Sequence, residues 1–481
     1  MLALGATGRA GSSQREAGSC AEAAEVAIHD DRLDWWQAAR FGLFVHWGPY
    51  SAAGVEASWP IMVPALARLV PQPAISESEY VALPARFDPR GFDPTAWVAL
   101  ARRAGMRYVV VTAKHHDGFC MFDAEGTDYK ITRTPYGRDA LAMLAEACAA
   151  AGMPLGFYYS PPDMHHAGYR DTRRPVTENW FGEAERPEWP AYLDYMERHL
   201  RQLLTGYGDV AIVWFDGLFD HERFQPERFR RLVRELSPRT LTNDRLGPGD
   251  YTTPEQFTPS GIPIKREGTA PQLTRAAFLR FVELLTSGRP AEELAAWFAA
   301  GRDRAYPTSL HPSPAEIQPW ETCMTMNGAW GYVPTDTSWK SPETLVRTLI
   351  ETASRGGNLL LNVGPRGDGA FPPEAVARLE AVGEWMAVHG DSIRGTAHGP
   401  LQGHSSVRST AGLGVVYLHL LEWPGEALAL AGFSPRVGSA TLLGGSEVAF
   451  RLEGGALRLT LPPHPPRSGP SVVALHGLAG R

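Results

Sequence analysis

The sequence has few cysteines, no long hydrophobic run and no block of basic residues, and each absence excludes a class of protein. Its four cysteines (Cys20, Cys120, Cys148 and Cys323) lie far apart and form no C-x-x-C pair, so neither a zinc-binding module nor a disulfide framework is indicated. No run of about 18 apolar residues predicts a membrane-spanning helix. The net charge of −7 comes without a dense Lys/Arg block, which argues against a surface that binds nucleic acid.

The N-terminal stretch lacks the apolar core of a secretory signal peptide. Gly, Ser and Arg interrupt MLALGATGRAGSSQREAGSC where that core would lie. We expect residues 1–30 to be a flexible lead-in and the protein to be cytoplasmic. The chain of 481 residues, 44% hydrophobic and 21% charged, can bury a sizeable core in two or three domains, or in one large barrel with an extra domain.

Short apolar runs alternate with longer helical stretches from residue 31 to residue 394. Asp93 precedes one such stretch as its expected N-cap, and glycine follows several of them. Continuous apolar strands that alternate with helices are typical of a parallel sheet covered by helices. The apolar runs are FGLFVHWG (41–48), RYVVVTAKHH (107–116), PLGFYYS (154–160), DVAIVWFDG (209–217), RTLTNDR (239–245) and GNLLLNVGP (357–365).

The residues that follow these runs distinguish a closed barrel from an open sheet. No G-x-G-x-x-G or P-loop follows the first run, which disfavours a nucleotide-binding open sheet. Nearly every run finishes on polar or aromatic residues, and chemistry collected from many strand ends is typical of a (β/α)8 barrel. Residues 31–394 are therefore predicted to form a (β/α)8-like barrel of the α/β class.

Two segments depart from the alternation. Residues 395–481 consist of short strands with Gly/Pro turns and no helix, which predicts a small C-terminal β-sandwich. Residues 264–311 have the pattern of two helices inserted between barrel elements, near the carboxyl end of a strand. An insertion at such a place often forms a lid or a pocket wall.

Several polar side chains at the strand ends are candidates for chemistry. Asp216 follows the apolar part of the run VAIVWFDG, and burying its charge uncompensated would cost several kcal/mol unless the strand ends in a polar cleft. His46, His115 and His116 could ligate a metal or bind substrate hydroxyls. Adjacent histidines on an extended strand point to opposite sides, so a metal site that uses both His115 and His116 requires the strand to bend there.

Two further carboxylates, Glu255 in GDYTTPEQF and Glu321 in PWETCMTMNGAWGY, compete as partners for Asp216. Paired carboxylates in a cleft lined by Trp and Tyr suit glycoside cleavage, because aromatic faces stack on sugars and the acids perform the chemistry.

At this level of detail the chain resembles the α-L-fucosidases of glycoside hydrolase family 29. The resemblance extends over about residues 34–393 and implies a (β/α)8-like barrel followed by a β-sandwich. The motifs that carry it, in family order, are RFGLFVHWGPYS, TAKHHDGFCMFD…TDYKITRTPYGRDAL, GFYYS, VWFDG, NDR, WETCMTMNGAWGY and GGNLLLNVGPRGDG…LEAVGEWMAVHGDSI.

The resemblance implies a retaining exo-α-L-fucosidase in which Asp216 forms a covalent fucosyl-enzyme. It places Glu255 as the acid/base, with Glu321 in reserve and near the substrate. It implies no cofactor and no metal, and a fucosylated glycan or small fucoside as substrate; a homo-oligomer is compatible with it. The fucose-binding positions of the family fall on His46, Trp59, His115, His116, Tyr158, Trp214 and Arg245.

The chain departs from the family at Ser58, because many members carry a Glu-Trp pair where this sequence has Ser58-Trp59. The lost carboxylate leaves a related sugar, an α-L-galactoside, as an alternative substrate, since an apolar pocket rejects one added hydroxyl only weakly. A metal-dependent barrel hydrolase that uses the histidines is a second alternative, and a catalytically silent sugar-binding protein is a third. Retention of both Asp216 and Glu255 argues against the silent binder.

Overall fold

The computed structural model describes residues 30–217, 221–265, 283, 308–313, 316–433 and 436–477. Its largest sheet has seven parallel strands in the order β5-β4-β3-β2-β1-β9-β8. None of the described helices is long and apolar enough to cross a membrane. The strands are β1 (Phe41–Val45), β2 (Val109–Lys114), β3 (Leu155–Tyr159), β4 (Val210–Phe215), β5 (Leu241–Thr242), β8 (Glu321–Thr325) and β9 (Asn358–Val363).

Residues 251–255 close this sheet into a barrel. Parallel bridges join Tyr251 to Asn243, directly after β5, and Glu255 to Cys323 of β8. The segment therefore pairs with both open edges of the seven-stranded sheet and takes the eighth position in the ring. Closure satisfies backbone groups that an open edge would leave unpaired.

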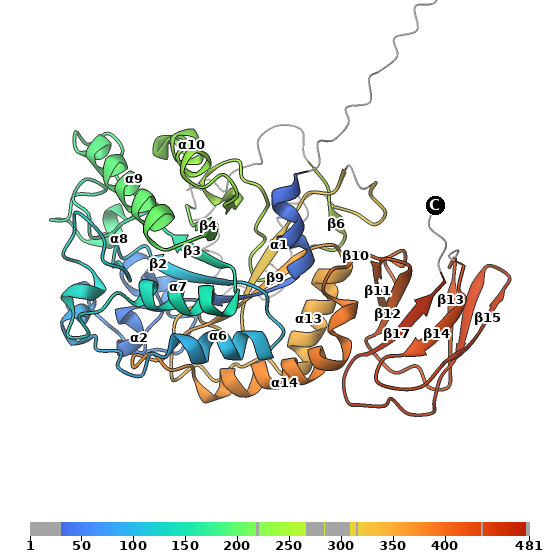
Figure 1. Cartoon of the computed structure of the whole chain (residues 1–481). Coiled ribbons are helices and arrows are strands. Elements are labelled where there is room, and N and C mark those ends of the chain that lie inside the picture. Colours follow the sequence, from blue (N-terminus) through green and yellow to red (C-terminus); the bar gives the residue numbers. More distant parts are fainter. Residues whose placement is uncertain are drawn as a thin grey trace, which may run out of the picture. The chain divides into compact units, whose positions relative to one another are not determined.

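Helices lie along the outside of the parallel sheet (Figure 1). Asp93 caps α6 by accepting a hydrogen bond from the Ala96 backbone N–H, as the sequence predicts, and Gly152 ends α7 in the left-handed region at a φ of 60°. The helices are α1 (Asp34–Ala39), α2 (Pro49–Ala53), α3 (Trp59–Met62), α4 (Pro64–Ala67), α5 (Glu77–Val81), α6 (Pro94–Arg103), α7 (Ala140–Ala151), α8 (Val176–Asn179), α9 (Trp189–Gly206), α10 (Pro226–Leu236), α13 (Pro342–Ser354) and α14 (Pro373–His389).

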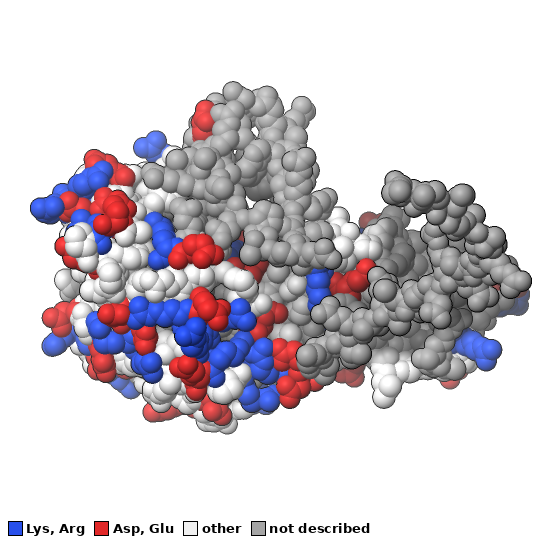
Figure 2. Space-filling model, turned by 90° about the horizontal axis from the view of Figure 1, so that it is seen from above, with Lys and Arg blue, Asp and Glu red and all other residues white. Residues whose placement is uncertain are grey.

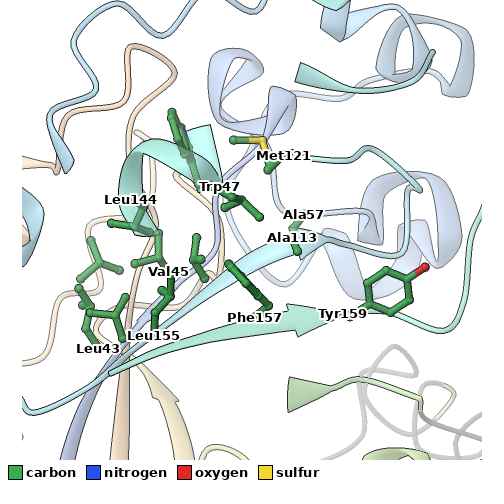
Figure 3. Close-up of a cluster of buried hydrophobic side chains, with 14 of the residues drawn as sticks. Leu43, Val45, Trp47, Ala57, Ala113, Met121, Leu144, Leu155, Phe157 and Tyr159 are labelled. Carbon is green, nitrogen blue, oxygen red and sulfur yellow. The ribbon is translucent and has the colours of Figure 1, made fainter. Parts of the chain in front are cut away.

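Alternate residues of the barrel strands belong to two separate hydrophobic clusters, because successive side chains of a strand point to opposite faces. Leu43 and Phe157 belong to the cluster shared with the helices, and Figure 3 shows them near Leu144 of α7. Phe44 and Trp214 belong to the smaller cluster inside the barrel. Both faces of the strands are thus buried, which explains their continuous apolar sequence.

The C-terminal strands form two antiparallel sheets that share one hydrophobic core. Leu418 and Val473 of one sheet pack in the same cluster as Leu430 and Leu457 of the other. The five-stranded sheet contains β10 (Ala397–His398), β11 (Val407–Gly412), β12 (Val415–Leu420), β17 (Ser471–His476) and β14 (Ser439–Leu442), and the three-stranded sheet contains β13 (Ala427–Ala431), β16 (Ala456–Thr460) and β15 (Ala449–Glu453).

The predicted fold class, a (β/α)8-like barrel followed by a small β-sandwich, is confirmed. The insertion predicted at 264–311 lies mostly outside the described residues, apart from a short ribbon of β6 (Ile262–Pro263) and β7 (Thr308–Ser309) at its ends. The lead-in predicted at 1–30 also lies outside them, except for its last residue. On the described surface in Figure 2, acidic and basic side chains are intermixed, in agreement with the absence of a basic block in the sequence.

Candidate active site

A pocket lies at the carboxyl ends of the barrel strands. Phe44 and Tyr158, the penultimate residues of β1 and β3, line it, and so does Asp216, the residue directly after β4. Most of the residues predicted from the sequence therefore meet in one place. The complete lining is Phe44, His46, Trp59, His115, His116, Tyr158, Trp214, Asp216, Glu255, Cys323 and Trp330.

Asp216 emerges where the buried part of β4 ends. Its side chain is 15% exposed, and its Oδ2 accepts a hydrogen bond of 2.6 Å from the Tyr158 hydroxyl. Its Oδ1 is buried, lies 3.5 Å from Nη1 of Arg245 and accepts no hydrogen bond from the described residues. Burial raises the pKa of Asp216, whereas Arg245 and the Tyr158 hydroxyl oppose the rise.

Arg245 links Asp216 to Glu255. Its Nη2 donates to Oε2 of Glu255 at 2.8 Å, while its Nη1 faces Asp216. Two hydrogen bonds to Thr253, from Nε to the hydroxyl at 3.0 Å and from Nη2 to the carbonyl at 3.2 Å, hold the guanidinium in place. Glu255 stands on the segment that closes the barrel and is 40% exposed. One guanidinium thus contacts a carboxylate that is 15% exposed and another that is 40% exposed.

The three predicted histidines line the pocket together. His115 and His116 both reach it, with ring centroids 4.4 Å apart, because β2 ends at Lys114 and its pairing with β3 is irregular just before that end. Each ring is anchored through Nδ1: His46 to Asn362 at 2.7 Å, His115 to Ser58 at 2.6 Å and His116 to Ser160 at 2.6 Å. The opposite nitrogen, Nε2, is the one available to a ligand.

Burial also determines the charge of these rings. It lowers the pKa of His46 and of His116 to about 3, and that of His115 well below the usual value. All three are therefore neutral near pH 7 and can accept or donate hydrogen bonds without adding charge to the pocket.

Aromatic rings surround these polar groups. Tyr158 stacks on His115 with an interplanar angle of 5° and on Trp214 with an angle of 14°. The Arg245 guanidinium lies over the Trp214 ring at 5.4 Å, and Trp59 stands edge-on to His116. These faces offer the apolar surface on which the CH groups of a sugar stack.

Glu321 does not reach the pocket, which differs from the expectation that it lies near the substrate. It is fully buried inside the barrel, where its carboxylate accepts hydrogen bonds from Tyr108 at 2.5 Å, Trp214 at 3.1 Å and Trp36 at 3.3 Å. Burial raises its pKa to about 7 in spite of these donors. As the first residue of β8 it lies at the opposite end of the strand from Thr325, so its contact with the pocket is indirect, through Trp214.

Sequence reasoning missed Glu56 and Asn362, which support the pocket from behind. Glu56 is buried, and its carboxylate accepts hydrogen bonds from the backbone N–H groups of Trp330, at 3.0 and 3.1 Å, and of Gly331, at 3.4 Å. Asn362 donates to the Trp330 carbonyl at 2.7 Å. Asn362 lies within the motif GGNLLLNVGP, but no pattern in the sequence signals that Glu56 is buried.

His115, His116 and Asp216 are also the described residues that could hold a metal ion, since one ligand atom of each lies within 4.8 Å of the others. The Arg245 guanidinium, 3.5 Å from Asp216, places a fixed positive charge beside that position. A cation there would therefore be repelled by Arg245. The two imidazoles and the carboxylate are common metal ligands, but the adjacent Arg245 guanidinium disfavours a metal at this position.

Comparisons with known proteins agree on one family. A family profile described as Alpha-L-fucosidase matches residues 12–269 and 291–391. The tissue alpha-L-fucosidase of Bos taurus is 25% identical over 472 residues, which cover 92% of this chain and 86% of that protein. The alpha-L-fucosidase of Dictyostelium discoideum is 25% identical over 89% of this chain and 87% of its own. The solved structure of alpha-L-fucosidase isoenzyme 1 from Paenibacillus thiaminolyticus superposes with a TM-score of 0.76 at 32% identity, covering 94% of this chain and 99% of that one.

The buried Glu56 generates a pH-dependent prediction. Burial raises its pKa from 4.5 to about 8, so the folded state binds more protons than the unfolded state between these values. Stability therefore falls as the pH rises through this window. Relative to Glu56→Gln, which cannot titrate, the wild-type free energy of unfolding should fall by up to about 1.4 kcal/mol per pH unit between pH 5 and 8. Urea unfolding at several pH values measures this difference, and a difference independent of pH would contradict it.

Proposed function

Because the chain belongs to the α-L-fucosidase family of glycoside hydrolases, we propose that it is a retaining exo-α-L-fucosidase acting through a covalent glycosyl-enzyme. The observation that carries this proposal is the carboxylate pair, Asp216 and Glu255, joined by Arg245 in a pocket of imidazoles and aromatic rings. Contact with a single guanidinium keeps the two carboxylates close. In retaining glycosidases they are about 5–5.5 Å apart, and inverting enzymes need room for a water between them.

Asp216 is suited to be the nucleophile. Its side chain lines the pocket and is 15% exposed, so its carboxylate can reach the anomeric carbon of a bound sugar. Arg245 and the Tyr158 hydroxyl favour the ionised form that attack requires. In the first step a carboxylate oxygen of Asp216 forms a bond to C1 while the bond from C1 to the glycosidic oxygen breaks.

Glu255 is suited to be the acid/base. It is the more exposed carboxylate of the pair. An acid/base needs this exposure, because it contacts both the leaving group and the incoming water. It would donate a proton to the departing oxygen in the first step. In the second step it would take a proton from the water that attacks C1 and releases Asp216.

The pocket supports fucose as the sugar, with hydroxyls bound by Nε2 of His46, His115 and His116 and the ring against Trp214. An α-fucosidase of Thermotoga maritima, 25% identical with a TM-score of 0.68, was solved in complex with fucose. Ser58 replaces the carboxylate that many family members hold beside Trp59, which makes an α-L-galactoside the alternative substrate. The ratio of kcat/KM for the two aryl glycosides decides between them.

Replacing Asp216 by Gly should lower turnover by about 10³-fold or more, because no other pocket group supplies the covalent step. Azide should partly restore activity by attacking from the vacated side, and the product should be the β-fucosyl azide. NMR of the product and circular dichroism of the variant provide the measurement and the control for folding.

A second control addresses the metal-dependent alternative. Exhaustive treatment with EDTA should leave wild-type activity unchanged. Near-normal activity of the Asp216→Gly variant, or loss of wild-type activity on EDTA that zinc restores, would contradict the proposal.

Replacing Glu255 by Ala should slow cleavage of natural fucosides by about 10²–10⁴-fold but spare formation of the fucosyl-enzyme from aryl fucosides with good leaving groups. Hydrolysis of the intermediate should then limit turnover, and azide should accelerate it with retention of configuration. Glu321→Gln is the matched control: it disturbs the hydrogen bonds to Trp214 and Tyr108, so its losses should not depend on the leaving group. Kinetics across a series of leaving groups that show the selective pattern for Glu321 rather than Glu255 would reverse the assignment.

A further inference from the structure

The three pocket histidines differ in the group that each Nδ1 contacts, and those contacts specify where each ring carries its proton. We propose that His46 and His116 present a bare Nε2 to the substrate whereas His115 presents an Nε2–H, and that Ser58 is the positioning residue that sets this difference. The inference deepens the proposed function, on which its substrate consequences rest. For the sugar hydroxyl bound to each histidine, it specifies whether that hydroxyl donates or accepts a hydrogen bond.

Asn362 determines which ring nitrogen of His46 carries the proton. The Asn362 Nδ2 donates to the Trp330 carbonyl at 2.7 Å, so its amide cannot be flipped without placing two acceptors against each other. The Asn362 Oδ1 then faces Nδ1 of His46 at 2.7 Å as an acceptor. Nδ1 must therefore carry the proton, and Nε2 of the neutral ring has the lone pair.

Ser160 places the proton of His116 on Nδ1, as in His46. The single hydroxyl hydrogen of Ser160 is donated to the Pro162 carbonyl at 2.8 Å. Ser160 can then only accept from Nδ1 of His116, which lies 2.6 Å away. Nε2 of His116 lies 3.4 Å from Oδ2 of Asp216, but no hydrogen bond joins these two described residues, so Nε2 offers its lone pair to the pocket.

Ser58 has the opposite effect on His115 and places its proton on Nε2. The Ser58 hydroxyl oxygen accepts the Asp117 backbone N–H at 2.9 Å, and within the described part of the chain Nδ1 of His115, at 2.6 Å, is the acceptor for its hydrogen. The Asp117 carboxylate accepts from Tyr80 and from the Phe119 backbone N–H, and no hydrogen bond joins it to the hydroxyl of Ser58 among the described residues. A neutral ring that accepts at Nδ1 carries its proton at Nε2.

The backbone of Ser58 supports a dedicated role. It is fully buried at a φ of 59°, in the left-handed region that side-chain-bearing residues rarely adopt. Its N–H donates to the Tyr80 hydroxyl at 2.8 Å, and that hydroxyl donates to Asp117 at 3.0 Å. Such a conformation persists only where the surroundings hold it, and it aims the hydroxyl at His115.

The pattern has a consequence for the substrate. A hydroxyl bound to His46 or His116 has to donate, whereas the hydroxyl bound to His115 has to accept. Fluorine accepts weakly and cannot donate, so replacing a hydroxyl by fluorine should be tolerated only at the position that faces His115.

Long-range ¹H–¹⁵N spectra of the ligand-free protein with ¹⁵N-labelled histidine test the inference at pH 7. We expect His115 as the Nε2–H tautomer and His46 and His116 as the Nδ1–H tautomer, with peaks assigned by single replacement of each histidine by Gln. Ser58→Ala should alter the signals of His115 and leave the tautomer of His116 in place, and the matched variant Ser160→Ala should do the reverse. A wild-type His115 with its proton on Nδ1 overturns the inference, whether or not either variant folds.

Binding of modified sugars provides the second readout. Dissociation constants of 2-, 3- and 4-deoxy-L-fucose are compared with those of the matching deoxyfluoro sugars. One fluoro sugar should bind about 2–10-fold more tightly than its deoxy partner, as expected for one retained hydrogen bond, and Ser58→Ala should abolish that difference. Equal affinities at all three positions contradict the inference. Failure of the proposed function would give a different result. Unmodified fucose would then not bind, while the histidine spectra would keep the expected pattern.

Discussion

The Asp216 side chain is only 15% exposed, and the residues around it are arranged so that its carboxylate can carry a charge there. An unpaired buried charge costs at least several kcal/mol. Arg245 and the Tyr158 hydroxyl offset this cost from two sides, one at each carboxylate oxygen. The neutral state of His46, His115 and His116 matters for the same reason, since further positive charge would compete with Arg245 for Asp216.

The barrel determines where Arg245 and Glu255 stand. Arg245 follows β5 and Glu255 lies on the segment that pairs with β8, so both depend on closure of the ring. Thr253, on the same segment, anchors the guanidinium. Glu321 extends this support inwards, because its hydrogen bond to Trp214 fixes the ring over which the guanidinium lies. One carboxylate in the barrel interior thus orients the groups that stabilise another at its mouth.

The sequence was sufficient to predict the barrel and the main residues of the pocket. Strands buried on both faces produce continuous apolar runs. The polar residue after most of these runs, such as His46 or Asp216, marks the carboxyl end of the strand, where the pocket lies. It was not sufficient for β8 and residues 251–255, which are short and rich in Thr and Glu. Their burial comes from their neighbours in the ring, so hydropathy does not reveal it.

Glu321 and Ser58 show the same limit at the level of single side chains. The sequence leaves Glu321 as a competing partner for Asp216, but the alternation of β8 turns it into the barrel interior, where three donors satisfy it. Nothing in the sequence around Ser58 predicts its contacts with His115 and Asp117, which arise only when α3 and the end of β2 are brought together. Contacts between segments far apart in the chain decide both cases.

The central claim, that Asp216 forms a bond to the sugar, is tested most directly by mass spectrometry after reaction with 2-deoxy-2-fluoro-L-fucosyl fluoride. Fluorine at C2 slows formation and breakdown of the intermediate, while the fluoride leaving group keeps formation the faster step, so the glycosyl-enzyme accumulates. The account predicts one fluorofucosyl adduct per chain, located by peptide mapping on Asp216 and lost on prolonged incubation. An adduct on another residue, or rapid hydrolysis of aryl fucosides with no adduct at all, would contradict it.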